Sequence, residues 1–340
     1  MPQPKLLATL VHISDLHIGR IDPASGDAAI STPVQVGLDN FPLFDGLLGH
    51  HAIALQDLEQ FVEDLRAADE KFHLIATGDL SRDGDVQDLA LARNYLEQEI
   101  DLNPPAGNFS GLHAGSRLLA IPGNHDHWAG HPTPVGNGAS NFYAALSRAL
   151  PATHSFPLGR HGHMLLLVEV DSDADVAANS SQRTFARGSF TSQLHKLDAL
   201  LAPRPAQELR VLAIHHARTW LGFTLGMSDS AKRELDRFLE QHQIAVILCG
   251  HTHLASARRH YPGSRVCWEC GAGTTTQFET VPFKWRLRLR RPRLPKPQTN
   301  TLMLHRIYDI AGRLEWEATT YVRSATGFNA LSPPRQFAVL

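Results

Sequence analysis

Cysteine is scarce in this chain of 340 residues, which has only Cys249, Cys267 and Cys270. So few cysteines exclude a disulfide-rich scaffold. Cys267 and Cys270 have the CxxC spacing of some metal and redox sites, but their segment is typical of a strand. Side chains three positions apart on a strand point to opposite faces. We therefore expect three reduced, mostly buried thiols, with a metal or redox site at CxxC as the weaker alternative.

Long apolar runs and an excess of one charge are also missing. No run reaches the roughly 18 residues that a membrane span needs. The apolar run at positions 6–13 lacks the usual companions of a signal peptide, so we expect a cytoplasmic protein. The 32 Lys and Arg residues and 34 Asp and Glu residues give a formal charge of -2. The overall charge gives no reason to expect a general polyanion binder.

Histidine, by contrast, is abundant, with 20 residues. It is the commonest metal ligand in proteins. Five apolar runs are typical of strands: 5–13, 72–77, 117–122, 209–214 and 244–249. Polar residues follow each run. In chain order they are Asp15 and His17; Asp79; Asn124, His125 and Asp126; His215 and His216; and His251 and His253. Ligands in open α/β sheets bind at the carboxyl ends of strands. One such pair is weak evidence, but five polar strand ends predict a metal site.

The apolar runs alternate with segments of helical spacing, which favours an α/β fold. Helices are predicted over 52–68, 86–100, 141–150, 190–202 and 231–242, and a further buried strand over 164–170. From residue 265 onward the pattern predicts strands, notably 301–308 and 313–321, joined by a hairpin turn at 309–312.

We expect one domain over residues 1–325, because there is no internal repeat and no clear boundary. Segment 19–50 is rich in Gly, Pro, Asp and Ser, and is predicted to be a long loop or insertion beside the first candidate ligands. A basic, proline-rich ribbon occupies 281–298. The tail 326–340 is expected to be loosely structured.

The polar motifs at the strand ends resemble the signature of the calcineurin-like metallophosphoesterase superfamily. They are Asp15-Leu16-His17, Gly78-Asp79 with Gly84, Gly123-Asn124-His125-Asp126, His215, and Gly250-His251-Thr252-His253. Order and spacing agree from residue 9 to about 277, with no ligand position substituted. A narrower similarity to the cyclic-nucleotide phosphodiesterase branch involves Gly188-Ser189-Phe190, Gln193 with Leu197, and the segment 271–277.

The resemblance implies a four-layer α-β-β-α sandwich with a β-rich C-terminal segment and two divalent or trivalent metal ions. Carboxylate, imidazole and amide ligands suit Mn, Fe or Zn. Carried over by position, one ion is held by Asp15, His17, Asp79 and His253, and the other by Asp79, Asn124, His215 and His251. Asp79 would bridge because a carboxylate offers two oxygens. His216 could replace His215, although the family pattern favours His215.

The implied activity is hydrolysis of a small phosphate ester by a hydroxide that bridges the two metals. Two metals about 3.5–4 Å apart can clamp the attacking and leaving oxygens. His125 matches the family's non-ligand histidine, which protonates the leaving oxygen. Asp126 would orient His125; an equally weighted alternative is a surface carboxylate.

The narrower similarity favours a phosphodiesterase that acts on a small cyclic nucleotide. Alternatives within the superfamily are a lipid-linked pyrophosphatase, a phosphomonoesterase or a nuclease. A catalytically silent binding or scaffold protein is the alternative of a different class.

The run from Lys284 to Lys296 alternates basic and apolar residues. It is predicted to be an edge strand kept soluble by its charges. Weak contact with an anionic membrane or a polyanion is the second hypothesis. The sequence leaves the oligomeric state open.

Overall fold

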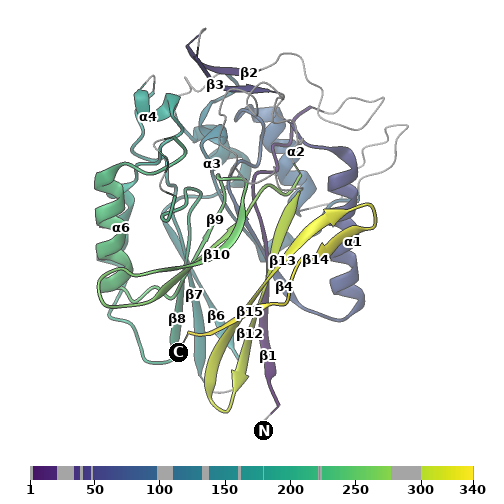
Figure 1. The fold of residues 1–340 in the computed structure, drawn as a ribbon, viewed down its shortest axis with the longest axis vertical. Helices are drawn as coiled ribbons and strands as arrows, with labels where there is room; N and C mark the ends of the chain where they lie inside the picture. Colours follow the sequence, from purple (N-terminus) through teal and green to yellow (C-terminus); the bar gives the residue numbers. More distant parts are fainter. Residues whose placement is uncertain are drawn as a thin grey trace.

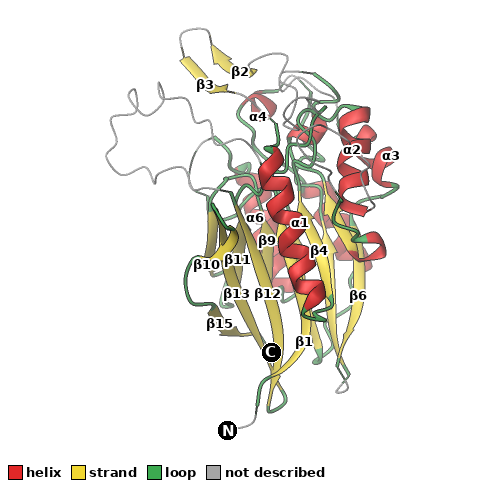
Figure 2. Ribbon diagram, turned by 90° about the vertical axis from the view of Figure 1, so that its right-hand side faces the viewer, coloured by secondary structure: helices red, strands yellow, loops and turns green. Residues whose placement is uncertain are grey.

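The computed structural model describes residues 3–20, 34–38, 41–46, 49–97, 110–131, 138–159, 162–178, 180–220, 222, 224–276 and 300–339. Its strands form two large sheets and one hairpin, in which β2 (Val34–Leu38) pairs with β3 (Phe41–Gly46). Figure 1 shows the two sheets in the middle of the molecule, between helix α6 (Asp229–Gln241) on the left and helix α1 (Ala52–Ala67) on the right. In Figure 2 the hairpin lies beyond the upper ends of the sheet strands.

The first sheet joins the start of the chain to its last strands. Its spatial order is β14-β13-β12-β1-β4-β5, with β15 also paired to β13. Strands β1, β4 and β5 are parallel, and β12 lies antiparallel to β1. The bounds are β1 (Lys5–Ile13), β4 (Phe72–Thr77), β5 (Leu118–Ile121), β12 (Thr301–Ile310), β13 (Arg313–Ser324), β14 (Gly327–Ala330) and β15 (Arg335–Ala338).

The second sheet has the spatial order β10-β11-β9-β8-β7-β6. Its four central strands are parallel, whereas both edge strands are antiparallel to their neighbours. The bounds are β6 (Ala152–Leu158), β7 (His163–Glu169), β8 (Glu208–Ala213), β9 (Val246–Cys249), β10 (Ala255–His260) and β11 (Cys267–Ala272).

Successive side chains of a strand point to opposite faces of its sheet, so one strand contributes residues to two hydrophobic cores. Val11 and Ile13 of β1 pack with the helices on the outer face of the first sheet, whereas Leu10 packs between the sheets. Leu212 of β8 faces outward, and Val211 faces inward. The covering helices are α1, α2 (Val86–Glu97) and α3 (Ser140–Leu146) on the first sheet, and α5 (Thr191–Leu200) and α6 on the second. The predicted four-layer α-β-β-α arrangement is confirmed.

The CxxC cysteines lie on opposite faces of β11, as the strand spacing predicts. Cys267 packs with the helices outside the second sheet, and Cys270 packs between the two sheets. Both are buried and free, as is Cys249. The spacing therefore does not bring the two thiols together.

The expectation of a loosely structured tail is wrong. Strands β14 and β15 both pair with β13. Phe337 of β15 is only 8% exposed, and its ring stacks on Trp268 with centroids 4.1 Å apart. Burial of this aromatic ring between the sheets fixes a segment that has little local strand signal.

Other predictions fall partly or wholly outside the described residues. Segment 19–50 contains the β2–β3 hairpin, and its positions 21–33, 39–40 and 47–48 are not among those described. The basic ribbon 281–298 lies outside them too, so its contact with a membrane or polyanion stays a prediction. Among the described helices, none combines the length and apolar character that a membrane crossing requires.

A buried polar chain crosses the first sheet on its inner face. The Trp316 indole donates to Nδ1 of His305 (3.1 Å), and Nε2 of His305 lies 3.3 Å from Nδ1 of His12. Nε2 of His12 then lies 3.0 Å from Oγ1 of Thr77. Burial lowers the pKa of His12 to about 3 and also lowers that of His305, so both rings are neutral. Their order of donors and acceptors fixes the Nε2–H tautomer of each.

Candidate metal centre

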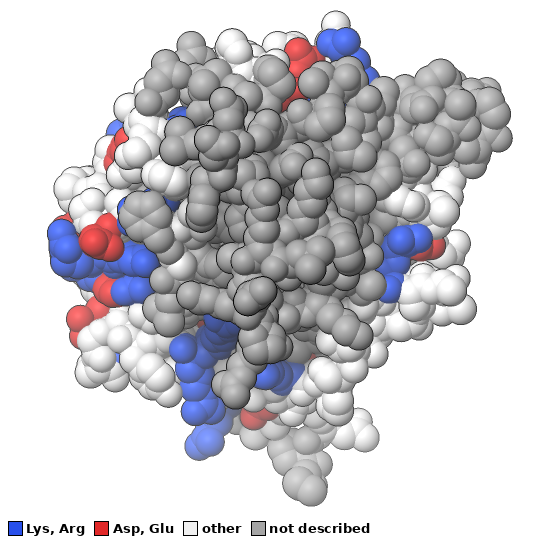
Figure 3. Space-filling model, turned by 45° about the horizontal axis from the view of Figure 1, so that its top comes forward, with Lys and Arg blue, Asp and Glu red and all other residues white. Residues whose placement is uncertain are grey.

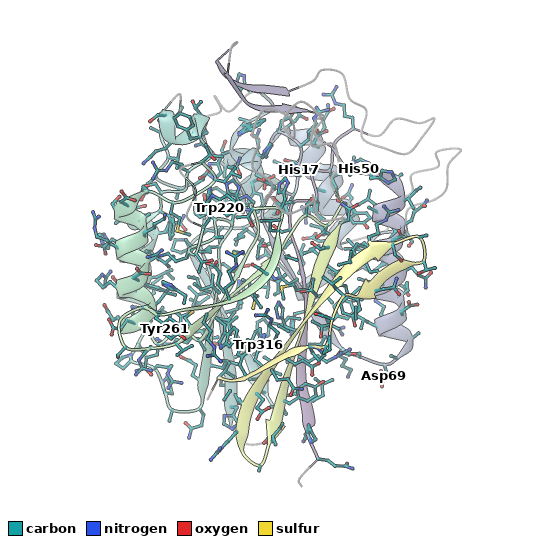
Figure 4. All side chains as sticks on the ribbon, viewed as in Figure 1. His17, His50, Asp69, Trp220, Tyr261 and Trp316 are labelled. Atoms are coloured by element: carbon teal, nitrogen blue, oxygen red, sulfur yellow. The ribbon has the colours of Figure 1, made fainter. Side chains whose placement is uncertain are left out.

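The predicted site residues lie in loops at one end of the two sheets. Asp15 and His17 follow β1, Asp79 follows β4, and the loops after β8 and β9 approach from the second sheet. Figure 4 labels His17 at this upper end. Figure 3 looks toward the same end, where acidic and basic side chains both occur around the described rim.

One group of donor atoms converges around His215. Its Nε2 lies 3.3 Å from Oδ2 of Asp79, 3.2 Å from Oδ1 of Asn124 and 3.1 Å from Nδ1 of His251. Nδ1 of His215 donates to the Thr77 carbonyl (2.7 Å), which leaves Nε2 as the ring nitrogen that faces the group. Since imidazole ligands are usually oriented in this way through their second nitrogen, the group could hold a metal ion.

A second group contains Asp15, His17, Asp79 and His253. Oδ1 of Asp15 lies 3.2 Å from Nε2 of His253, and Nε2 of His17 lies 3.9 Å from Oδ2 of Asp79. Both ring nitrogens of His17 are buried without a hydrogen-bond partner among the described residues. Buried polar atoms normally have partners, so this group also fits a metal ion.

Asp79 connects the two groups through a single oxygen. Oδ1 accepts a hydrogen bond from the backbone N–H of His125 (2.8 Å), while Oδ2 faces both His17 and His215. A bridge through both carboxylate oxygens, as expected from the sequence, stays a prediction. Only Oδ2 faces both groups, because Oδ1 is hydrogen-bonded to the loop that carries His125.

The protonation of these residues follows from their mutual charges. Burial disfavours the charged form of His215, but Asp79 outweighs burial and raises the pKa of His215 to about 10. Burial and His125 lower the pKa of His17 to about 3. His17 is therefore a neutral ligand, whereas a metal ion must displace a proton from His215.

The backbone at these positions is unusual. Five of the candidate ligands have left-handed φ values: Asp15 (53°), His17 (50°), Asp79 (51°), His251 (67°) and His253 (53°). Such conformations cost on the order of 1 kcal/mol or more each and cluster at functional sites. They turn the chain sharply after each strand, so that Asp15 and His17 reach the same group while His251 and His253 reach different groups.

At two positions only glycine fits, because a neighbouring loop approaches the backbone closely. A Cβ on Gly123 would collide with Oδ1 and the backbone nitrogen of Asp79. A Cβ on Gly250 would collide with the Ser14 hydroxyl and crowd Oδ2 of Asp15. The glycines therefore allow adjacent loops to pack directly against the candidate ligands.

His125 lies at the edge of the centre, and one of its ring nitrogens is already hydrogen-bonded. Its Nδ1 donates to the carbonyl of Arg82 (2.9 Å), and its ring stacks on Trp128 with centroids 3.9 Å apart. A ring nitrogen of His125 lies within 4.8 Å of ligand atoms of His17 and Asp79. Nε2 is therefore the nitrogen available for chemistry.

Asp126 has a different contact set from the one expected. Its carboxylate accepts the backbone N–H groups of Leu80, Ser81 and Gly123, at 2.9–3.1 Å, and the Ser81 hydroxyl. The orientation of His125 by Asp126 is thus a wrong prediction, because the Arg82 carbonyl orients that ring. Asp126 is fully buried and holds the loop after Asp79 against the loop that carries Asn124.

His216 points away from the donor groups. Its Nδ1 lies 2.8 Å from the Ser172 hydroxyl, and its Nε2 lies 3.2 Å from the Ala186 carbonyl. The same carbonyl lies 3.1 Å from Nε2 of His251, which leaves Nδ1 of His251 facing His215. Of the two adjacent histidines, His215 is the one that joins the candidate ligands.

Several residues hold the ligand-bearing loops in place, and no sequence motif identified this role. The hydroxyls of Thr274 and Thr276 donate to the carbonyls of Asp15 and Leu16, and Oγ1 of Thr275 accepts from the Ser14 N–H. Thr77, Arg82 and Ala186 act through backbone carbonyls, which any residue type could provide. The threonines belong to segment 271–277, which the narrower family similarity did single out.

The comparison with known families agrees with this geometry. The model of the calcineurin-like phosphoesterase family matches residues 8–255. No curated protein matches the chain significantly.

Three solved structures are among those found to be similar to this chain. A predicted phosphoesterase from Streptococcus pneumoniae TIGR4 is 11% identical, with a TM-score of 0.36 and coverage of 98% of this chain and 99% of that one. Vps29 complexed with zinc from Entamoeba histolytica is 8% identical, with a TM-score of 0.35 and coverage of 98% and 99%. Chaetomium thermophilum Vps29 is 10% identical, with a TM-score of 0.38 and coverage of 99% and 100%. Similarity at this level says nothing about activity.

Proposed function

Because the chain belongs to the calcineurin-like phosphoesterase family, we propose that it hydrolyses a phosphate ester at the two donor groups that share Asp79. The cofactors would be two first-row ions, Mn, Fe or Zn. The first would be held by Asp15, His17, Asp79 and His253, and the second by Asp79, Asn124, His215 and His251. The observation that carries the proposal is the single Asp79 oxygen that faces both groups.

The charge of the centre suits an anionic substrate. Two bound ions would supply Lewis-acid polarisation of the phosphoryl oxygens and a nucleophile at neutral pH. Asn124 offers an uncharged oxygen, so Asp15 and Asp79 are the only carboxylates among the candidate ligands. With two divalent ions and neutral imidazoles, the centre would keep a net charge of about +2 (4 − 2), which favours phosphate binding.

His125 would protonate the leaving oxygen. The hydrogen bond from Nδ1 to the Arg82 carbonyl orients the ring, so that Nε2 is the nitrogen that would deliver the proton. General-acid catalysis of this kind contributes about 10²–10⁴-fold to turnover.

For the substrate, we propose a phosphodiester, in the narrower case a small cyclic nucleotide. The support is the similarity of segments 188–197 and 271–277 to the cyclic-nucleotide branch. In the described part of these segments, the Gln193 side chain accepts a hydrogen bond from the Asp171 N–H, and the threonines brace the Asp15 loop. These contacts support the centre but do not select a substrate.

The test is a substrate panel with Mn-loaded protein. It compares bis(4-nitrophenyl) phosphate, 4-nitrophenyl phosphate, cyclic nucleotides, pyrophosphate-linked compounds and DNA. We expect diesters to be hydrolysed faster than monoesters. A clear preference for 4-nitrophenyl phosphate would contradict diester specificity. Absence of any hydrolysis by protein with two bound ions would favour the scaffold alternative.

A further inference from the structure

A second polar cavity lies at the opposite end of the second sheet from the candidate metal centre. Its volume is about 140 Å³, and its wall includes Arg204, Glu208, Arg210, Gln243, Arg265 and the side chains of Val266 and Val339. The cavity borders the starts of β8 and β9, whereas His215 follows the end of β8. Figure 4 labels Tyr261, near the turn that carries Arg265, in the lower part of the molecule and His17 at the top.

The two sites are well separated. From Glu208 at the cavity to His215 the chain advances seven residues, mostly along β8. At about 3.3 Å per residue, this corresponds to roughly 20 Å. The cavity is therefore no extension of the candidate metal centre.

The positive charge of one of the three arginines in the cavity wall is balanced by a carboxylate of the same wall. The Arg210 side chain is buried, and its Nε donates to Oε1 of Glu208 (2.6 Å). Its two Nη groups donate to the carbonyls of His242 and Ala202. Every nitrogen of this guanidinium is thus committed, and Glu208, the one carboxylate in the wall, balances its charge.

Neither of the other two guanidinium groups forms an ion pair with a carboxylate in the described part of the chain. Arg204 donates from Nε to the Gln243 side-chain oxygen (2.8 Å) and from Nη1 to the Glu208 carbonyl (2.7 Å), both uncharged acceptors. Its Nη2 has no hydrogen-bond partner among the described residues. Arg265 is exposed, and its side chain forms no hydrogen bond or ion pair with the described part of the chain. The wall therefore has a net charge of +2, from three arginines and one glutamate.

The surroundings make this charge costly unless an anion is present. Burial, followed by the charges of Arg265 and Arg210, lowers the pKa of Arg204. Val266, Val339 and Ile244 supply apolar wall beside the arginines. A bound anion would relieve the repulsion between the arginines.

We propose that this cavity binds a small tetrahedral oxyanion, phosphate or the phosphate group of a small metabolite, between Arg204 and Arg265. A guanidinium group presents parallel N–H donors that match two phosphate oxygens. Nη2 of Arg204 and the whole Arg265 group are the donors available for such contacts. The volume suffices for a phosphate group.

Methyl-resolved NMR of the Mn-free and metal-loaded full chain tests the proposal locally. The Val266 and Val339 methyl groups report on the cavity, and those of Leu16 and Ile18 report on the candidate metal centre. Sodium sulfate is titrated first, because it is tetrahedral and avoids metal phosphate precipitation, and inorganic phosphate follows with metal-free protein. Sodium chloride holds the ionic strength constant. We expect saturable shifts at Val266 and Val339.

Two variants separate a built site from general charge attraction. Arg265→Gln should weaken sulfate binding tenfold or more, the effect of losing one charged hydrogen bond. Arg313→Gln removes an exposed arginine on the β12–β13 hairpin and should leave binding unchanged. Arg204→Gln should also weaken binding, but this residue supports the fold through its own hydrogen bonds, so the exposed Arg265 is the decisive position.

Shifts that grow linearly without saturation would overturn the proposal. So would equal shifts with chloride, or equal affinity in Arg265→Gln and the parent. None of these results bears on hydrolysis, because Arg265→Gln should turn over bis(4-nitrophenyl) phosphate at the parent rate. An inactive parent protein would contradict the proposed function and leave the cavity result valid.

Discussion

At the residue scale, the candidate centre depends on which atom of each side chain is already engaged. Oδ1 of Asp79 accepts from a backbone N–H, Nδ1 of His215 donates to a carbonyl, and Nε2 of His251 faces another carbonyl. Each contact leaves another ligand atom of the same side chain facing the shared centre. Ligand geometry is thus prepared by hydrogen bonds outside the ligand set.

The role of His125 can be separated from metal binding. His125→Ala should keep near-parent metal content while lowering turnover by about 10²–10⁴-fold, because a general acid is lost. The deficit should be smaller for nitrophenyl esters than for alkyl esters, since a leaving group of low pKa needs no proton. Steady-state kinetics with both ester types measures this difference. His131→Ala, at an exposed histidine nearby, is the control. Equal deficits for the two esters would argue against the acid role.

The close approach at Gly123 gives a second prediction. In Gly123→Ala the new methyl group would collide with Asp79, so the carboxylate must move away from both donor groups. We expect lower metal content and a comparable loss of turnover. Gly115→Ala is the control, because its Cβ would meet nothing within 4 Å while its φ of 53° still causes backbone strain. If Gly123→Ala bound metal like the parent, the close packing of the two loops would not matter.

At this scale the sequence identified the candidate ligands but not their engaged atoms. The motif spacing singled out Asp15, Asp79 and His215, because polar residues directly after buried strands must gather at one sheet edge. It could not show that Arg82 and Ala186 orient the imidazoles, since a backbone carbonyl carries no residue signature. For the same reason the assigned role of Asp126 was wrong.

At the element scale, a bidentate ion pair connects the end of α1 to the first sheet. Arg306 of β12 donates to both carboxylate oxygens of Glu70, at 2.8 and 2.9 Å, and the Thr9 hydroxyl of β1 donates to Oε1. Burial opposes ionisation of Glu70, but the hydrogen bonds and charge of Arg306 outweigh it and lower the pKa. The connection therefore depends on the ionised carboxylate.

This lowered pKa predicts a defined pH dependence. The folded-state pKa of Glu70 lies below the usual 4.5, so the unfolded chain takes up the proton first as the pH falls. The stabilisation is present above about pH 4.5 and is lost as the pH falls through the lowered pKa. Glu70→Gln should reduce the free energy of unfolding at pH 7 by about 1–3 kcal/mol, and by less in more acidic buffer. Urea unfolding at several pH values measures it, with the exposed Glu63→Gln as control. A pH-independent difference would contradict this account.

Strands that are buried on both faces were predictable, and those stabilised by distant partners were not. Strands 5–13 and 72–77 have the predicted bounds, because each is a continuous apolar run that ends in polar turn residues. β6 alternates between exposed and half-buried residues, and β14 and β15 have four residues each. Such short or half-exposed strands form because β7 or β13 offers free hydrogen-bonding groups, which local patterns do not reveal.

At the scale of the whole molecule, the packing of two sheets creates the candidate centre. Asp15, Asp79 and Asn124 follow strands of the first sheet, whereas His215 and His251 follow strands of the second. The apolar core between the sheets brings these loops together. Neither sheet alone supplies a complete donor group.

A metal ion should therefore stabilise the packing of the two sheets. Ligands that bind only the folded state raise its stability with the logarithm of the ratio of ligand concentration to Kd. We expect removal of metal by a chelator to lower the Tm and re-addition of Mn to restore it, as measured by calorimetry. The Asp79→Ala variant should show a much smaller Tm difference. An unchanged parent Tm across this cycle would mean that metal does not link the sheets.

Metal content per chain decides whether two metal ions share Asp79. Mass spectrometry should find two ions in the Mn-loaded parent and in Asp64→Ala, which removes an exposed carboxylate of α1. Asp79→Ala should lose both ions, because Oδ2 of Asp79 faces both donor groups. Two ions retained in Asp79→Ala would contradict the shared centre.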